Sequence, residues 1–453
     1  MAISEALKKQ IHDSQQEVVK EISRLVAQPS VSATGQGVEE CAGIVQRMVE
    51  DIGGKTRVLR LPGVAPLVYG ELMGADLGKT LLIYNHYDVQ PPEPLELWRS
   101  PPFKPEVRDG RLYGRGVSDD KGHLVARLKL IEAYVKVNGR PPCNIKFCYE
   151  GEEETGSGHL EEYVSKNREL FKADAVLWEY GSIDKEGRPV IELGVKGMVY
   201  VELTVRTLSR DAHSSLAAVL PNPVWRLVRL LGKIKDERDR ILIPGWYDHI
   251  QGLTAEEKAV LQREPSEAES LLTDYGTKAF SGNMSLEDAK AALVAGPTGN
   301  IAGIWGGYSG PGSKTVLPAE AHCKMDFRLV PGQDPKDLET KFIKFLSDNG
   351  YSDVEVKMHT SEPAARTKLD SPWAQAAVSA AGEVFGRKPV IQISSAGTGP
   401  LYVFTRGYNA DAIDIGFSPQ DDAMHAPNEN IRLDYLEKGM VWIAQTIENF
   451  LKP

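Results

Sequence analysis

The sequence predicts an α/β protein in which a mostly parallel sheet is interrupted by an inserted α+β domain. In the N-terminal third, and again after residue 360, short and fully apolar runs alternate with helical stretches. Strands that are buried on both faces and joined by helices form parallel sheets. Between residues 198 and 359, apolar and polar residues instead alternate one by one, which is typical of a sheet with one exposed face. We therefore expect a main domain over residues 1–197 and 360–453, with an inserted domain over 198–359.

The helices and strands of the main domain follow from hydrophobic periodicity. Apolar residues at helical spacing predict helices over residues 4–27 and 38–52, and each helix is followed by a proline or a glycine pair. A third helix, over 124–137, is expected to connect two strands, and a fourth, near 433–451, closes the chain. The strands expected in the parallel sheet are 80–84, 145–149, 175–178, 390–394 and 412–416.

The inserted domain has a different pattern. Strict alternation over 199–206 and 321–329 predicts two strands that each have one buried and one polar face. Asp334 and Pro335 are a suitable cap and first residue for a helix over 335–348. The stretch 236–297 is polar and helical only in patches, so we expect a lid or surface excursion there.

The composition excludes several functional classes. The 453 residues include 53 Lys+Arg and 63 Asp+Glu, a net charge of −10, which argues against nucleic acid as the main partner. No run approaches the roughly 18 apolar residues of a membrane span. The N-terminal segment lacks the apolar core of a signal peptide, and the four cysteines are scattered without a CxxC pair. We expect a cytoplasmic protein with reduced thiols and with neither a membrane nor a nucleic-acid partner.

The segment LLIYNHYDVQ places His86 and Asp88 at the end of an apolar strand. Residues i and i+2 of a strand point to the same face, so Asp88 can hold the imidazole. Metal-binding histidines usually donate their second ring N–H to such a carboxylate. Taken alone, however, this pattern is more often a strand-end histidine beside a solvated aspartate.

The segment DGRLYGRGVSDDKGHL places Asp119 and Asp120 in a glycine-rich loop before the helix expected over 124–137. A single aspartate in this position is usually a helix cap. Two adjacent carboxylates at the C-terminal edge of a parallel sheet favour a ligand site, because open α/β sheets bind ligands at that edge.

The segment IKFCYEGEEETGSGHL has four glutamates among the five residues 150–154, directly after a strand. Carboxylates this close repel one another unless cations or protons are supplied. A divalent metal would supply that charge, and an unligated glutamate beside it could act as general base on metal-bound water. Glu179, just after the strand 175–178, and His425, in SPQDDAMHAPNE, are weak signals when each is taken alone.

Together these segments predict a two-metal hydrolytic site. Two histidines and several carboxylates are each expected just after a strand of the same sheet. Mixed histidine and carboxylate ligands suit Zn²⁺, and Mn²⁺ or Co²⁺ could substitute. The spacing leaves open which glutamate binds metal and which acts as base.

The motifs NHYDVQP, GRGVSDDKG and EGEEETGSG, followed by the His425 segment, resemble the co-catalytic zinc peptidase family. That family includes aminoacylase-1, carboxypeptidase G, carnosinases and cytosolic nonspecific dipeptidase, acetylornithine deacetylase and succinyl-diaminopimelate desuccinylase. The resemblance runs over nearly the whole chain. EPLELWRSPPFKP and GYSGPGSKTVLPAEAHCKMDFRLVPGQDP are most similar to the dipeptidase and carnosinase branch. The resemblance implies a di-zinc catalytic domain and a lid domain through which two subunits form a homodimer.

The resemblance also implies the metal ligands. His86 and Glu179 would hold one metal, and Glu154 and His425 would hold the other. Asp119 would bridge both metals. This assignment rests on the matching motifs, because spacing alone does not distinguish the glutamates.

Further roles come from the resemblance in the same way. Glu153 would be the general base that takes a proton from the bridging water and passes it to the leaving amine, and Asp88 would orient His86. His213 would reach across the homodimer and stabilise the oxyanion in the partner's site. The groups that would contact the substrate, chiefly its carboxylate, are Arg328, Asn300 and the loop Gly397-Thr398-Gly399.

The chain departs from the family pattern at two positions, and the first leaves open whether the substrate needs a free amino terminus. The dipeptidase branch usually has aspartate where this chain has Glu179, whereas the acylases and carboxypeptidases have glutamate. The lid motif reads His213-Ser214-Ser215 rather than His-Ser-Gly. We therefore expect a hydrolase of dipeptides or short peptides with a free carboxylate. The alternatives are an N-acyl-amino-acid deacylase and, in a different class, a non-catalytic metal-binding relative.

Overall fold

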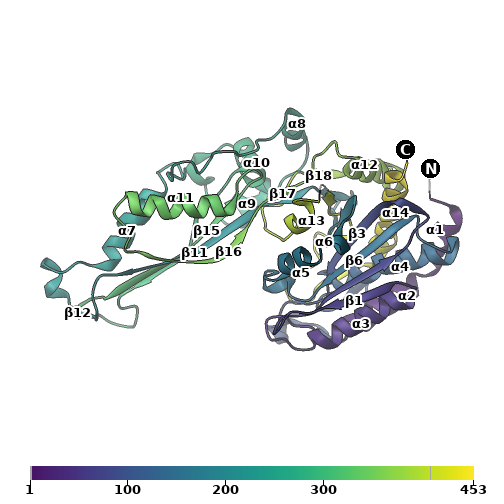
Figure 1. Ribbon diagram of the computed structural model, residues 1–453, viewed down its shortest axis with the longest axis horizontal. Helices are drawn as coiled ribbons and strands as arrows, with labels where there is room; N and C mark the ends of the chain where they lie inside the picture. The colour runs from purple at the N-terminus through teal and green to yellow at the C-terminus, as the bar shows by residue number, and fades with distance from the viewer. Residues whose placement is uncertain (1–2, 409, 453) are drawn as a thin grey trace. The chain divides into compact units, whose positions relative to one another are not determined.

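The computed structural model describes residues 3–408 and 410–452, which form two compact units. Unit 1 comprises Met1–Gly194, Arg366–Ile393 and Gly399–Pro453, and unit 2 comprises Val195–Ala365 and Ser394–Thr398. Figure 1 shows the chain with its elements labelled. Among the described residues, no helix combines the length and the apolar character that crossing a bilayer would require.

A six-stranded sheet with the order β1-β2-β6-β3-β7-β19 forms the centre of unit 1. Neighbouring strands among β6, β3, β7 and β19 are parallel, whereas β2 is antiparallel to both β1 and β6. The predicted α/β fold with a mostly parallel sheet is therefore confirmed. The strands are β1 (Lys55–Leu59), β2 (Leu67–Leu72), β3 (Asp76–His86), β6 (Cys143–Glu150), β7 (Ala175–Leu177) and β19 (Asp411–Ile413).

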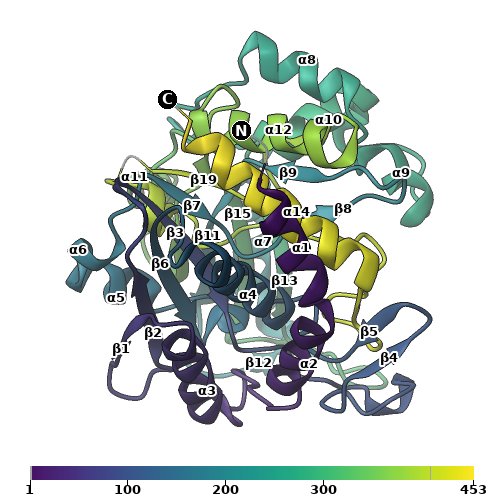
Figure 2. The same cartoon turned by 90° about the vertical axis from the view of Figure 1, so that its right-hand side faces the viewer.

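Helices cover both faces of this sheet. Right-handed crossovers from β3 to β6 and from β6 to β7 run in opposite directions, so α4 and α5 lie on opposite faces. Figures 1 and 2 show α2 and α3 on the same side as α4. The helices of unit 1 are α1 (Glu5–Asp13), α2 (Gln15–Val26), α3 (Val38–Asp51), α4 (Lys121–Asn138), α5 (Leu160–Lys166), α6 (Arg168–Phe171), α12 (Pro372–Phe385), α13 (Tyr402–Thr405) and α14 (Leu433–Phe450).

Two details of unit 1 differ from the expected elements. The single helix predicted over 4–27 is wrong, because Ser14 divides it into α1 and α2. The Ser14 N–H donates to the carbonyl of Gln10 and its hydroxyl donates to that of Ile11. The strand expected at 390–394 is present as β18 (Val390–Gln392), but it pairs with β9 (Val190–Glu192) in a separate two-stranded sheet.

Short elements complete unit 1. They lie in the segments that connect the main strands and helices. β21 pairs with β5, and β20 pairs with β8. These elements are η1 (Leu95–Leu97), β4 (Glu106–Arg108), β5 (Arg111–Tyr113), η2 (Glu153–Thr155), β8 (Ser182–Ile183), β20 (Ser418–Pro419) and β21 (Asn430–Arg432).

Unit 2 is built on a four-stranded antiparallel sheet with the order β13-β15-β11-β16. Alternate residues of β11 and β15 are buried, and Phe327 is among those that face the apolar core, whereas Arg328 lies on the polar face. Helices α7 and α11 pack on the apolar face. The strands are β11 (Gly197–Arg206), β13 (Asn300–Gly306), β15 (Glu320–Leu329) and β16 (Glu355–Glu362).

The remaining elements of unit 2 include the polar stretch 236–297, which forms short helices as expected. In unit 2, β12 pairs with β14. A further short pair, β10 (Gly194–Val195) with β17 (Ala365–Arg366), lies where the chain passes from one unit to the other. The other elements are β12 (Ala212–His213), η3 (Ser214–Ala218), α7 (Pro223–Ile234), α8 (Ala255–Arg263), α9 (Ala268–Asp274), η4 (Ser281–Asn283), α10 (Leu286–Ala295), β14 (Val316–Leu317) and α11 (Pro335–Asp348).

Candidate metal centre

Several of the predicted site residues lie at the C-terminal edge of the parallel strands, at or just after the ends of β3, β6 and β7. β3 ends at His86, directly beside Glu150 at the end of β6. The turn η2, which carries Glu153 and Glu154, follows β6 after two residues. β7 ends two residues before Glu179, whose backbone carbonyl accepts a hydrogen bond from the Asn85 side chain at 3.1 Å. Parallel strands therefore bring these side chains to one edge although they are distant in sequence.

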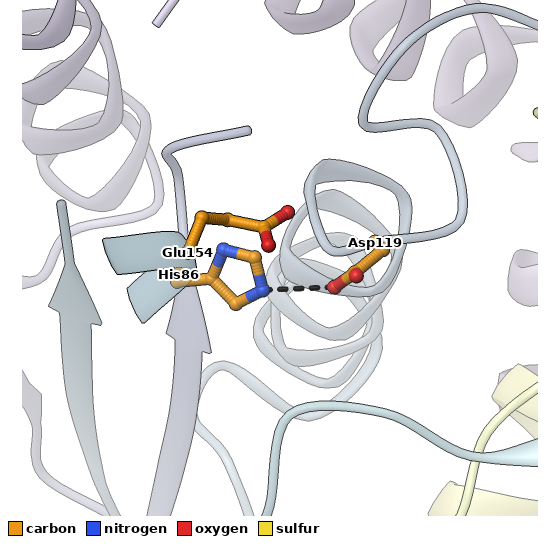
Figure 3. Close-up of side chains that lie close together, drawn as sticks. All are labelled: His86, Asp119 and Glu154. Carbon is orange, nitrogen blue, oxygen red and sulfur yellow. Dashed lines mark hydrogen bonds and ion pairs between the residues drawn. The ribbon is translucent and has the colours of Figure 1, made fainter. Parts of the chain in front are cut away.

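Asp119 lies at the centre of this group. One of its carboxylate oxygens, Oδ1, is 2.9 Å from His86 Nε2, and the other, Oδ2, is 2.8 Å from His425 Nε2. His425 Nε2 is also 3.2 Å from Glu154 Oε2. Figure 3 shows His86, Asp119 and Glu154 pointing toward one another, and one ligand atom from each lies within 4.8 Å of the others. This group could hold a metal ion.

Asp88 joins His86 to the turn that carries the glutamates. Its carboxylate accepts hydrogen bonds from the backbone N–H of Glu153 at 3.2 Å and of Glu154 at 3.0 Å. His86 Nδ1 is 3.1 Å from the Asp88 backbone carbonyl and 3.4 Å from its carboxylate. An acceptor at Nδ1 favours the tautomer in which Nε2 is free to bind a metal.

Two of the predicted site residues, both glutamates, have strongly raised pKa values. Burial raises the pKa of Glu153 to about 8, with Asp119 and Glu154 reinforcing the shift and His86 opposing it. Burial, followed by the charge of Glu153, raises the pKa of Glu179 well above its ordinary value. The Glu179 Oε2 atom is buried without a hydrogen-bond partner among the described residues. An orphaned carboxylate oxygen of this kind is costly unless a cation or proton satisfies it.

The two histidines have pKa values shifted upward by the same carboxylates. Hydrogen bonds to Asp119 and Glu154 raise the pKa of His425 to about 10. Burial opposes protonation of His86, yet Asp119 and Asp88 raise its pKa well above the ordinary value. A histidine binds a metal through a ring nitrogen that carries no proton. Metal binding at Nε2 would therefore displace the protons from these two imidazoles. The donor set and the orphaned Glu179 oxygen therefore fit divalent cations.

Five further predicted residues lie in unit 2. His213, at the end of β12, is exposed, and its Nδ1 is 2.9 Å from the Ser215 hydroxyl. Arg328 Nη1 donates to the Thr398 hydroxyl at 2.5 Å, and Gly397 accepts from the Lys196 backbone N–H at 2.9 Å. Asn300 donates to Asp326 Oδ1 at 2.9 Å. Gly399 belongs to unit 1, next to Thr398 in the chain.

Two buried carboxylates support the site in ways that the sequence did not predict. Asp120 Oδ2 accepts from Asn85 Nδ2 at 2.7 Å and from the His86 backbone N–H at 3.1 Å, which fixes the end of β3. Glu429, four residues after His425, accepts hydrogen bonds from the loop that carries Asp119. Their hydrogen-bond partners are largely backbone groups, which leave no pattern in the sequence. Only their closeness in the sequence to Asp119 and to His425 could have indicated them.

The sequence matches the family model described as peptidase family M20/M25/M40 over residues 82–449. The chain belongs to this peptidase family. It is therefore a hydrolytic enzyme, and the predicted family resemblance and its dipeptidase branch are confirmed by the relatives that follow.

Relatives of the chain cover most of its length. A Beta-Ala-His dipeptidase of Homo sapiens is 32% identical over 85% of this chain and 78% of the relative. A Cys-Gly metallodipeptidase, dug1, of Schizosaccharomyces pombe is 30% identical over 95% of this chain and 94% of the relative. Among solved structures, the M20 family metallo-carboxypeptidase Sso-CP2 of Sulfolobus solfataricus is 38% identical with a TM-score of 0.88, covering 96% of this chain and 99% of that one.

Proposed function

We propose that this M20 family enzyme is a metal-dependent dipeptidase or carboxypeptidase that cleaves the amide bond of short peptides with a free carboxylate. The observation that carries the proposal is the sharing of Asp119 between His86 and His425, at 2.9 and 2.8 Å, beside Glu154. One carboxylate between two histidines provides ligands for two adjacent cations. The dipeptidases and the metallo-carboxypeptidase among the relatives support the same reaction class.

We assign His86 and Glu179 to one metal ion, Glu154 and His425 to the other, and Asp119 to both. The orphaned, buried Oε2 of Glu179 supports its place in this set. Two Zn²⁺ ions, or Mn²⁺ or Co²⁺ in their place, would polarise the scissile carbonyl and lower the pKa of a water molecule. Asp88 holds His86 Nδ1 and the backbone of the glutamate turn, so it orients ligands of both ions.

Glu153 is the proposed general base. It neighbours Glu154 in the turn η2, and its backbone N–H is fixed by Asp88 at 3.2 Å. In this role its carboxylate takes a proton from the attacking water and delivers it to the nitrogen of the leaving amine. Burial raises the pKa of Glu153 to about 8 without metal, and nearby divalent cations would lower that pKa toward the range in which a carboxylate acts as a base near neutral pH.

The substrate carboxylate is assigned to Arg328 and the loop Gly397-Thr398-Gly399, with Asn300 as a further contact. Arg328 is already oriented by the Thr398 hydroxyl at 2.5 Å. A guanidinium fork and backbone N–H groups are well suited to binding a carboxylate.

A hydrolysis screen tests the proposed function. With Zn²⁺, Mn²⁺ or Co²⁺ added, free dipeptides are expected to be cleaved faster than their N-acetylated counterparts, and about two metals per chain should bind. Each dipeptide and its N-acetylated form differ only at the amino group, so they are a matched pair. Faster cleavage of the acetylated forms would replace the proposal with an N-acyl-amino-acid deacylase. Metal binding without hydrolysis of either form would contradict the proposed substrate class.

We propose further that unit 2 forms a homodimer contact. β13 is an edge strand that is exposed along nearly its whole length, with Ile304 48% and Trp305 45% exposed. Gly306 of β13 lies against Val224 of α7, and on the same helix Trp225 is 62% exposed. Unpaired strand edges and exposed apolar side chains are features that a second copy of the chain would cover.

Mixed dimers test the proposed role of His213 in the partner's site. His213→Ala alone is expected to lower kcat by about 10²–10³-fold, as loss of an oxyanion donor does. Mixing it with an Asp119→Ala variant should restore about a quarter of wild-type activity, because half of the dimers then contain one complete site. Activity no higher than that of either parent, with subunit exchange verified by mass, would contradict a contribution across the dimer.

We also propose a reducing, cytoplasmic location. All four cysteines are free and buried. Burial raises the pKa of the Cys143 thiol to about 12 and that of Cys148 well above its ordinary value, so these thiols are poorly reactive. Buried, unpaired thiols are typical of proteins that work in reducing compartments.

A further inference from the structure

The two loops that meet at Asp119 belong to parts of unit 1 that are far apart in the sequence. Asp119 lies two residues before the start of α4, and His425 lies between β20 and β21, 306 residues away in the sequence. The two side chains nevertheless approach to 2.8 Å. Some contact other than chain connectivity must therefore hold one loop against the other.

Glu429 provides that contact. Its side chain is fully buried, and Oε1 accepts hydrogen bonds from the backbone N–H groups of Ser118 at 2.8 Å and Asp119 at 3.0 Å. Oε2 accepts from the backbone N–H of Gly116 at 2.8 Å and from Arg115 Nη1 at 2.8 Å. Every donor to this carboxylate lies within residues 115–119, and one of them is the backbone of Asp119 itself.

The chemistry of these donors requires a carboxylate. A carboxylate offers two acceptor oxygens, whereas an amide of the same size has one acceptor oxygen and one NH₂ donor. A glutamine at position 429 would direct its NH₂ group at two donors from the loop and leave them unsatisfied. The buried charge is compensated by Arg115, which is 1% exposed. Buried charges are retained only where such pairing and hydrogen bonding compensate for the loss of water.

Hydrogen bonds within the loop that carries His425 fix the position of Glu429 relative to that loop. The Asn430 N–H donates to the Asp422 carbonyl at 2.8 Å, and the Asn430 side chain donates to the Asn428 carbonyl at 3.1 Å. The Ser118 hydroxyl donates to the Asp422 carboxylate at 2.6 Å, which is a second link between the two loops.

We infer that Glu429 is a positioning residue for the metal centre. By holding the backbone of residues 116–119 against the loop of His425, it places the Asp119 carboxylate where it can serve both proposed metal ions. Glu429 acts through Asp119 and touches neither substrate nor metal. This inference rests on the proposed role of Asp119 as the shared ligand.

The test is metal binding by Glu429→Gln, measured by titrating the metal-free protein with Zn²⁺ or Co²⁺ alone. The affinity of the variant is expected to fall by about 10–100-fold, the usual effect of losing an outer partner of metal ligands. At saturating metal, kcat should fall while KM stays near the wild-type value, because the substrate contacts are unchanged. The matched control is Asp421→Asn, which removes a carboxylate of the same loop that pairs with Arg111 at 2.9 Å on the surface. This control should bind metal as the wild type does.

The outcomes separate this inference from the proposed function. If the wild type binds two metals and folded Glu429→Gln binds them with the same affinity, the positioning role is overturned while the proposed function stands. If the wild type itself binds no metal, both proposals fail. If Glu429→Gln does not fold, Glu429→Asp decides, because it keeps the charge opposite Arg115 but is too short to reach all four donors. Reduced affinity in folded Glu429→Asp supports the inference, and wild-type affinity overturns it.

Discussion

Glu153→Ala is expected to lower kcat by about 10²–10⁴-fold while two metal ions per chain stay bound. Burial, reinforced by the charges of two proposed metal ligands, Asp119 and Glu154, raises the pKa of Glu153 to about 8. Alanine removes the group that accepts the proton of the attacking water, but it removes no proposed ligand. It also removes a buried carboxyl that must take up a proton on folding near neutral pH, so the metal-free variant should fold at least as stably as the wild type.

The measurement pairs kcat with metal content in the same preparation. Glu152→Ala is the matched control, because the Glu152 carboxylate accepts from the His159 backbone N–H at 2.8 Å and lies 2.8 Å from the His159 ring rather than in the cluster. The control should keep kcat within a few-fold of the wild type. Glu153→Ala with two metals and near-normal kcat would show that another group is the base.

Much of the candidate site was predictable because the C-terminal ends of parallel strands lie at the same edge of the sheet. The ends of β3, β6 and β7 were expected from their apolar runs, and the fold then brings His86, the glutamate turn and Glu179 to one edge. The sequence did not distinguish the glutamates by spacing alone. In the structure the Glu152 carboxylate is occupied by His159, whereas Glu150 and Glu179 each keep a buried oxygen without a hydrogen-bond partner among the described residues.

Other features were not predictable because their partners are backbone atoms or distant segments. Glu429 is recognised only through N–H groups about 310 residues earlier, which leave no periodicity or spacing in the sequence. The Asp88 carboxylate was expected to hold His86, but the nearer acceptor of His86 Nδ1 in the structure is the Asp88 backbone carbonyl, and the carboxylate accepts from two backbone N–H groups of the glutamate turn. At the break, the Ile11 carbonyl accepts hydrogen bonds from the Ser14 hydroxyl and the Gln15 side chain, and such local side-chain bonds compete with the helical backbone pattern.

Asp119→Ala is expected to abolish the dinuclear centre. Both proposed ions lose a ligand at once, so metal content should fall from about two to below one per chain, with kcat/KM down by about 10³-fold or more. Dialysis against metal followed by elemental analysis measures the first effect, and hydrolysis of the best dipeptide measures the second. Asp353→Ala, which removes a surface carboxylate paired with Arg226, is the control and should change neither quantity.

The same variant tests the geometry without any metal. In the metal-free wild type, the hydrogen bond to Asp119 is the largest cause that raises the pKa of His425 to about 10, followed by the bond to Glu154. Removing Asp119 should therefore lower the His425 pKa toward its ordinary value, as read from the imidazole signals in an NMR titration of the metal-free protein. A His425 pKa that stays near 10 in the variant would mean that Glu154 alone holds the imidazolium. Asp119 would then not be the carboxylate that is shared between His86 and His425.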